Sequence, residues 1–139
     1  MKVSNCKSKL SFKDYIVNKI EFNNNIKCDN KEITMDFDFD SKVEFGEDDK
    51  FILYLSVELF KDAEKNNYPF NFKADLIGFF ELNEVEESKK QVYAEQNAVA
   101  ILFPYLRALI TTYTGMANVQ PLILPPINVA KYIENKKKK

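Results

Sequence analysis

Apolar and polar residues alternate along most of the first half of the chain. In the clearest stretch, residues 33–45, Ile33, Met35 and Phe37 share one face and acidic residues share the other. A period of two predicts a β-strand with one buried face. The same period predicts further strands at Asp14–Asn23, Lys50–Lys61 and Phe70–Leu82, separated by turns at Gly46–Asp49 and Asn66–Pro69.

The last two predicted strands are apolar on both faces near their middles. Phe51, Leu53 and Leu55 share one face of Lys50–Lys61, and Ile52 and Tyr54 share the other. A sheet that is apolar on both faces must be covered on both faces. Helices of the same chain are expected on one side, and a second subunit is a candidate cover for the other.

The hydrophobic period changes in the second half of the chain. Apolar residues recur every three or four positions from Val99 to Met116, which predicts a helix with one broad apolar stripe. Asn97 is a suitable N-cap, Pro104 either bends the helix or lies in its first turn, and Gly115 is placed to end it. A short last helix is predicted at Ile127–Asn135. Strands that precede helices favour an α+β fold with an antiparallel sheet.

The length of 139 residues indicates a single domain, 1–139, with flexible ends expected at 1–11 and 136–139. Aromatic residues make up 14% of the chain, and twelve of them are Phe. A small domain seldom buries that much aromatic surface by itself, which favours subunit association or an apolar ligand surface. A Phe-rich core is the simpler explanation of the same excess.

The residue types exclude several classes of function. The chain has no histidine, so the commonest general base and zinc ligand are missing, and its glycines form no phosphate-binding loop. We therefore expect no enzyme and no metal or other cofactor. Cys6 and Cys28 are too few and too far apart for a disulfide framework. The N-terminus is polar, and the longest apolar stretch, Ala98–Ile110, is too short to span a bilayer. These features and the low cysteine count favour a cytoplasmic location.

Charge is unevenly distributed, although the net charge is only −1. Residues 29–64 carry twelve acids and four bases, whereas residues 131–139 carry five bases and one acid. The overall balance indicates neither a nucleic-acid partner nor membrane insertion. We interpret the C-terminal lysines as a solvated tail.

Five acidic residues fall at the spacing of calcium ligands in an EF-hand loop. They are Asp36, Asp38, Asp40, Glu44 and Glu47. The loop needs glycine at its sixth position, where this chain has Ser41. The strand alternation explains every residue of the segment, so we interpret the acids as a solvated strand face and keep calcium binding as the alternative.

Two segments of the second half carry a resemblance to a known family. Residues 101–107, ILFPYLR, resemble the ILFPYAR segment at the first long helix of the SecB family of protein-export chaperones. Residues 122–129, LILPPINV, look like its LNLAPVNF. Residues 32–38 are similar to its EVKLDLD strand, and Phe70–Leu82 aligns with its fourth strand. The resemblance covers residues 12–134.

The resemblance implies both an architecture and a function. The family fold is a four-stranded antiparallel sheet with two helices that assembles as a dimer of dimers. The family acts as an ATP-independent holdase, which binds unfolded polypeptides and preproteins in long apolar grooves. By resemblance, client contacts fall on Ile33, Met35 and Phe37, and subunit contacts fall on Phe72, Ala74 and Leu76.

One expected partner of the family fits this chain poorly. SecB-family proteins dock onto the translocase motor SecA through acidic residues on the outer sheet surface. The matching positions here are Lys19, Asn23 and Lys73, and none is acidic. The resemblance keeps SecA as a possible partner and protein export as a possible role, although a basic or neutral surface does not complement a basic partner by that route. Two alternatives stay open: a dedicated chaperone of an antitoxin, and an α+β protein that binds lipid or another small molecule in an apolar cleft.

Overall fold

The computed structural model describes residues 9–29, 34–119, 122–124 and 127–138. The elements in chain order are β1 (Leu10–Asn24), β2 (Phe37–Phe45), β3 (Lys50–Leu59), α1 (Ala63–Asn66), β4 (Phe70–Leu82), α2 (Glu87–Tyr93), the π-helical segment η2 (Ala94–Ala98), α3 (Val99–Met116) and α4 (Val129–Lys137).

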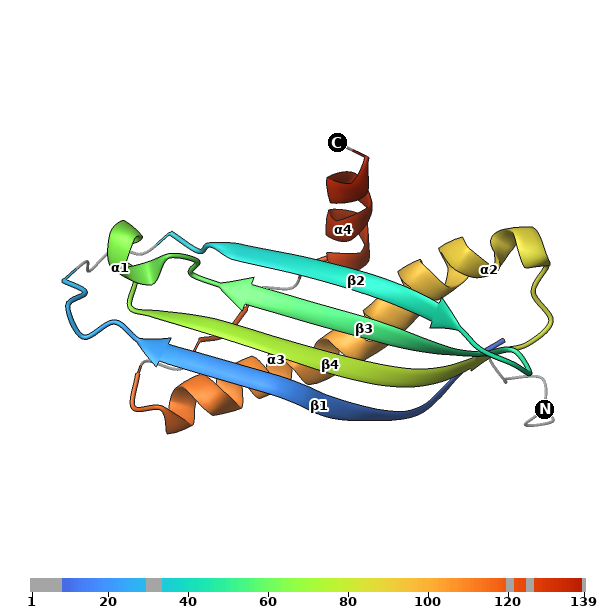
Figure 1. Cartoon of the computed structure of the whole chain (residues 1–139), viewed down its shortest axis with the longest axis horizontal. Coiled ribbons are helices and arrows are strands. Elements are labelled where there is room, and N and C mark those ends of the chain that lie inside the picture. Colours follow the sequence, from blue (N-terminus) through green and yellow to red (C-terminus); the bar gives the residue numbers. More distant parts are fainter. Residues whose placement is uncertain (1–8, 30–33, 120–121, 125–126, 139) are drawn as a thin grey trace.

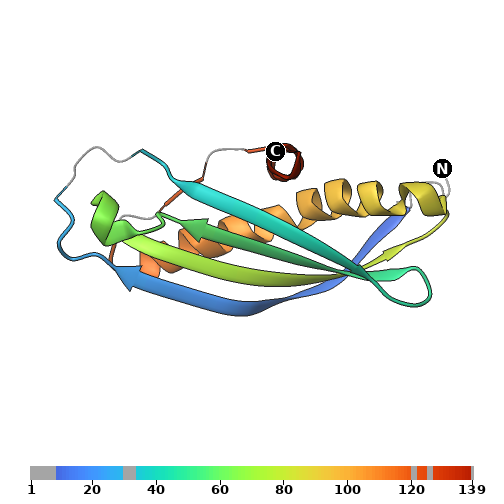
Figure 2. The ribbon, with the colours of Figure 1, turned by 45° about the horizontal axis from the view of Figure 1, so that its top comes forward.

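The strands form one antiparallel sheet with the order β1-β4-β3-β2, so β1 and β2 are its edges. Helices α2, α3 and α4 lie on one face of this sheet (Figures 1 and 2). The α+β fold predicted from the sequence is confirmed. The register of β1 against β4 shifts twice, between Phe12 and Asp14 and between Val17 and Lys19, which marks two bulges on that edge strand.

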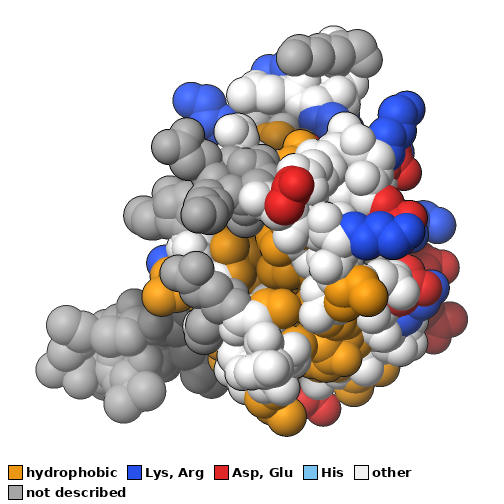
Figure 3. All heavy atoms as spheres, turned by 90° about the vertical axis from the view of Figure 1, so that its left-hand side faces the viewer, with side chains coloured by type: hydrophobic (Ala, Val, Ile, Leu, Met, Phe, Trp, Pro, Cys, Tyr) orange, Lys and Arg blue, Asp and Glu red, His pale blue; other side chains and the backbone are white. Residues whose placement is uncertain are grey.

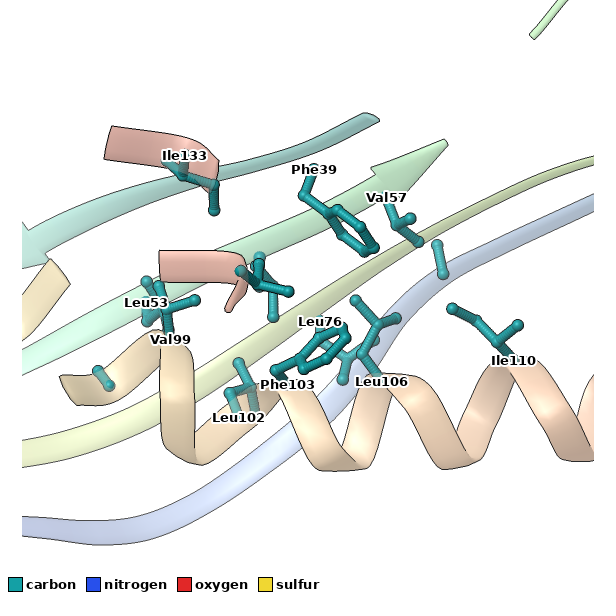
Figure 4. Packing of buried hydrophobic residues seen from close by; sticks show 14 of the residues in the cluster. Phe39, Leu53, Val57, Leu76, Val99, Leu102, Phe103, Leu106, Ile110 and Ile133 are labelled. Carbon is teal, nitrogen blue, oxygen red and sulfur yellow. The ribbon is translucent and has the colours of Figure 1, made fainter. Parts of the chain in front are cut away.

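The core lies between the sheet and α3. Alternate residues of β3 and β4 point at the helix, and Leu53, Leu55 and Leu76 are at most 1% exposed. The apolar stripe of α3 contributes Leu102 and Leu106, both fully buried. Figure 4 shows Leu53 and Leu76 of the sheet on the side that faces α3, with Leu102 and Leu106 of that helix. The two periods that the sequence displays, two and 3.6, therefore meet in one hydrophobic layer.

The long helix begins earlier than the sequence pattern predicts. Asn97 is not its N-cap but lies inside η2, because α2, η2 and α3 follow one another without a break from Glu87. The added turns are polar, so they carry no apolar period. They are fixed by tertiary contacts instead: Lys90 reaches Asp49 at 2.9 Å, and Ala94 is fully buried.

Pro104 lies inside α3 rather than in a first turn. Its missing N–H leaves the carbonyl of Ala100 without the usual helical donor. By length and composition alone, the helix Glu87–Met116 could cross a membrane, in contrast to the shorter stretch expected from the sequence. In this structure α3 packs along the sheet and contributes five side chains to the buried core: Val99, Leu102, Phe103, Leu106 and Ile110.

Gly78 marks a close approach of α3 to the sheet. A Cβ atom placed on Gly78 would lie 2.7 Å from Cε2 of Phe80 and 3.2 Å from Cδ2 of Leu102. The Phe80 ring itself stacks on Phe51 with ring centroids 5.2 Å apart. The missing side chain therefore makes room for a ring and a helix residue together.

The buried side-chain amide of Asn25 connects the end of β1 to α1 and to the turn that follows it. Asn25 is 6% exposed, and its side chain donates to the carbonyls of Tyr68 at 2.8 Å and Ala63 at 3.2 Å. Its backbone N–H donates to the carbonyl of Pro69 at 2.9 Å. A short helix, α1, which the sequence pattern did not predict, thus precedes the predicted turn Asn66–Pro69 and is held against the end of β1.

The C-terminal segment packs back onto the molecule. The backbone N–H of Leu122 donates to Oγ1 of Thr114 at 2.9 Å, and Asn128 caps α4 by accepting from the N–H of Lys131 at 3.0 Å. Lys136 and Lys137, expected in a solvated tail, lie in the last turn of α4. The chain after α3 therefore covers the sheet near β2.

Candidate functional site

Apolar side chains remain on the outer face of the sheet, opposite the helices. Ile16, Ile77 and Tyr54 form one cross-strand row, and Phe79 and Ile52 belong to the next. Ile16 is 45% exposed and Tyr54 is 36% exposed. No described helix or strand lies over this face (Figures 1 and 2). This bears out the sequence pattern in which the central strands are apolar on both sides.

A second apolar surface follows α3 and the edge strand β1. Tyr105 of α3 contacts Tyr15 and Phe12 of β1, with ring centroids 4.6 Å and 5.4 Å apart. Tyr105 remains 40% exposed, and Met116 at the end of the same helix is 80% exposed. Figure 3 looks at the end of the molecule that carries α1 and shows hydrophobic side chains gathered in the middle of that end. Exposed apolar surface is thus present on both α3 and the edge strand β1.

A third surface, which we call the β2–α4 site, contains the predicted client residues that the structure describes. Phe37 contacts Phe39 and Tyr132, with ring centroids 5.3 Å and 5.4 Å apart, and is only half-buried. Met35 is also half-buried against the core. Ile33 lies outside the described residues. The β2–α4 site is therefore an aromatic cluster whose outer part stays open to solvent.

Asp38 of β2 and Lys136 of α4 form an ion pair between the two elements. The Nζ of Lys136 lies 2.7 Å from Oδ1 of Asp38, and the Tyr132 hydroxyl donates to the same oxygen at 3.3 Å. The hydrogen bond to Asp38 raises the pKa of Lys136. Burial, then the nearby Asp38 charge, raises the pKa of Tyr132. Both groups are thereby held in their protonated forms.

Lysines also contact the free edge of β2 itself. The Nζ of Lys136 donates to the carbonyl of Phe39 and the Nζ of Lys137 to the carbonyl of Ser41, each at 3.3 Å. Lys137 lies 3.6 Å from a carboxylate oxygen of Glu95 as well. Sequence patterning missed these contacts, because they join residues that are far apart along the chain. The only signal for them is the unequal charge of the acidic first half and the basic end.

A small cavity of about 100 Å³ adjoins this edge, between β2, η2 and α4. Val92, Ala130 and Ile133 give it apolar walls, and Ser41 lines it from the strand. Ser41 is 8% exposed, and its hydroxyl has no hydrogen-bond partner among the described residues. A buried hydroxyl without a partner is costly, so the cavity is a place where another group could be accepted.

The predicted subunit contacts lie deep inside the single chain. Phe72 and Ala74 are fully buried and Leu76 is 1% exposed, all on the helix-facing side of β4. Their role at an interface stays a prediction. Side chains without exposed surface cannot touch a second copy directly, so the exposed parts of β1 and α3 are the better candidates for such a contact.

The outer face is mixed in charge at the positions expected to meet SecA. Lys19 pairs across the strands with Asp75, and Asn23 pairs with Asn71. Lys73 lies 3.7 Å from Glu21 and 3.9 Å from Glu58. Alternating signs of this kind do not form the acidic surface that a basic partner requires.

The acidic side chains do not converge on a metal. Asp38, Asp40 and Glu44 are spaced along one face of β2, as the strand interpretation predicts. Among the described residues, no group of three or more His, Cys, Asp or Glu side chains is placed to hold a metal ion. The chemistry available at these surfaces is thus apolar burial combined with main-chain and lysine hydrogen bonds.

A family model and a protein of known sequence both match nearly the whole chain. A family model described as SecB, preprotein translocase subunit SecB, matches residues 5–139. The uncharacterized protein MJ0357 of Methanocaldococcus jannaschii is 39% identical over 132 residues, which span 93% of this chain and 85% of that protein.

Two solved structures share the fold. The SecB-like chaperone Rv1957 of Mycobacterium tuberculosis, in complex with a ChAD peptide from the HigA1 antitoxin Rv1956, superposes with a TM-score of 0.70 at 17% identity, covering 85% of this chain and 89% of that one. A protein of unknown function from Streptococcus agalactiae superposes with a TM-score of 0.52 at 12% identity, covering 84% and 97%.

Proposed function

The chain belongs to the SecB family, and from this premise we propose that it is an ATP-independent holdase that keeps unfolded polypeptides from aggregating in the cytoplasm. The proposal is carried by the half-open aromatic cluster of Phe37, Phe39 and Tyr132 at the β2 edge, together with the partly exposed rings of α3 and β1 at the opposite edge of the sheet. Unfolded chains expose apolar side chains, and burying them contributes roughly 25 cal/mol per Å².

Many shallow apolar contacts suit a protein that binds different sequences. Flexible and aromatic surfaces repack against varied partners without a strict demand on shape. The family is one of chaperones rather than enzymes, and the described part of the chain holds no cluster of metal-ligating side chains. We therefore propose binding without catalysis.

We also propose that the chain works as an oligomer, a dimer of dimers. Its support is the apolar surface that a single chain leaves open on β1 and α3 and on the outer sheet face. Exposed patches beyond a few hundred Å² are unusual on monomers and mark interfaces or binding sites. Coupling to export through SecA is not part of the proposal, because Lys19, Asn23 and Lys73 occupy the docking positions.

Two assays test the proposal. The first measures binding of reduced, carboxymethylated α-lactalbumin, and the second follows the aggregation of a reduced protein by light scattering. At micromolar concentration and without ATP, we expect a stable complex and suppressed scattering. The mass of the active species, measured by light scattering on a sizing column, tests the oligomer. Unchanged aggregation together with a compact monomer would remove the proposal.

A dedicated antitoxin chaperone is the second candidate. It is favoured by the fold shared with Rv1957, which was solved with an antitoxin peptide. The two functions separate in one measurement: a dedicated chaperone binds one antitoxin segment tightly and unrelated unfolded proteins poorly, whereas a general holdase binds both with similar affinity.

A further inference from the structure

We propose that the outer edge of β2 at Phe39–Ser41 is a strand-addition site for an extended client segment, which Lys136 and Lys137 cover in the free protein. The inference rests on the proposed function, since it specifies how a client is held. It starts from the backbone of β2, which is an edge strand and bonds to β3 on one side only.

The backbone groups on this edge are bonded to side chains instead of to a neighbouring strand. The carbonyls of Phe39 and Ser41 accept from the ammonium groups of Lys136 and Lys137. The N–H of Ser41 donates to Oδ1 of Asp40 at 2.9 Å. In an antiparallel pair, the N–H and C=O of one residue point to the same side, so residues 39 and 41 both face away from β3. These are the groups that an added strand would bond.

The covering groups are easily removed. The side chains of Lys136 and Asp38 are 38% and 57% exposed, and that of Lys137 is 43% exposed. Exposed ion pairs contribute little, and lysine side chains are flexible. A client backbone can therefore take over both carbonyls while α4 stays in place through buried Val129 and Ile133.

The space beside the edge suits an extended chain. Figure 1 shows α4 crossing behind β2 and projecting beyond its outer edge, so an added strand would lie against the projecting end of the helix. The cavity lined by Ser41, Val92, Ala130 and Ile133 has a volume of about 100 Å³ and would receive one small side chain of that strand. An incoming polar group there would also give the Ser41 hydroxyl a partner.

This arrangement fits the needs of a promiscuous chaperone. Main-chain hydrogen bonds are the same for every sequence, so strand addition supplies affinity without selecting side chains. The aromatic cluster next to the edge then adds apolar contacts with the client residues that face it. Covering the edge with lysines also keeps unoccupied copies from pairing with each other.

Amide exchange tests the site directly. With carboxymethylated α-lactalbumin bound to the full chain, exchange should slow at the N–H groups of Phe39 and Ser41. Exchange should change little at Asp38 and Asp40, whose N–H groups already face β3. If the client binds and Phe39 and Ser41 exchange as before, strand addition is wrong although the holdase function stands. If no client binds, the proposed function itself fails and the inference fails with it.

Two further experiments sharpen the result. A short client peptide is made in an unmethylated form and in a form N-methylated at two adjacent central residues, so that one methyl group removes a bond to β2 in either register. The methylated form should bind at least about tenfold more weakly. Equal affinities would overturn the proposal. The double variant Lys136→Ala/Lys137→Ala should bind the client about two- to tenfold more tightly. The charge-matched control is Lys131→Ala/Lys138→Ala, one lysine within α4 and one at its C-cap. It should not bind more tightly, and equal gains in both double variants would also overturn the proposal.

Discussion

Gly78 offers a quantitative test of how the helix layer meets the sheet. In Gly78→Ala, the added Cβ would lie 2.7 Å from the Phe80 ring and 3.2 Å from Leu102, both of which are buried at 2% exposure or less. Phe80 cannot turn away freely, because it stacks on Phe51 with an interplanar angle of 7°. Overpacking in a well-packed core costs about 1–3 kcal/mol.

The collision can be separated from the backbone effect of removing a glycine. Alanine loses less conformational entropy than glycine on folding, which favours the variant by about 0.5–1 kcal/mol. Gly46→Ala is the matched control, because its Cβ would meet only the Lys50 carbonyl at 3.7 Å and neither glycine has a positive φ. The difference in unfolding free energy between the two variants therefore isolates the collision, about 1–3 kcal/mol.

The assay is urea unfolding followed by circular dichroism, at one protein concentration so that any oligomer contributes equally. We expect Gly78→Ala to have the lower midpoint, with an unchanged m-value. If the two variants unfold within about 0.3 kcal/mol of each other, the close approach of α3 at Gly78 does not exist as described.

Four further outcomes are expected. Phe37→Asp should weaken binding of unfolded α-lactalbumin about tenfold, since it replaces an apolar contact of roughly 50–100 Å² by a charge. The control is Phe45→Asp, on the same face at the far end of β2, which should change binding little. Equal losses of affinity in the two variants would contradict the β2–α4 site. Met35→Asp should act in the same direction while the mass of the oligomer stays constant, and normal client binding by both Met35→Asp and Phe37→Asp would move the site elsewhere. Asn25→Leu should lower the unfolding free energy by about 1–3 kcal/mol, because the Tyr68 carbonyl loses its amide donor and the Ala63 carbonyl keeps only its backbone donor, the N–H of Tyr68; a neutral result in urea unfolding would show that water replaces the amide. Stability should fall as the pH rises above about 10, since the folded chain raises the pKa values of Lys136 and Tyr132 and so favours their protonated forms; this contribution is complete below the unfolded pKa values and is lost above the folded ones. Asp38→Asn, followed by thermal unfolding from pH 8 to 11, should show a shallower decline, and an identical one would disprove the link.

Residue periodicity predicts the sheet well where a strand has neighbours on both sides. The observed bounds of β4, Phe70–Leu82, match the predicted ones, because every second residue of a central strand faces the core. At the edges the pattern is weaker. The segment before β2 continues the alternation, but the strand begins only at Phe37. Alternation reports which way side chains face and cannot show where a partner strand ends.

Hydrophobic periodicity cannot predict the polar start of the long helix or the lysine contacts that cover the edge of β2. Residues 87–93 have no periodic apolar face, and in the fold they are positioned by the ion pair of Lys90 with Asp49 and by the packing of Tyr93 against the core. Lys136 meets Asp38 because the fold brings the chain's end back to its second strand. Charge composition suggests that such a pairing is possible, but the particular partners depend on the angle at which α4 crosses the sheet.

The two register shifts of β1 determine how well this edge of the sheet could template an aggregate. Amyloid growth requires a long straight template on which identical strands stack in register. On β1, the shifts at Phe12/Asp14 and Val17/Lys19 interrupt any such template after a few residues. This edge of the sheet is thus a poor template for fibres built from copies of the chain itself.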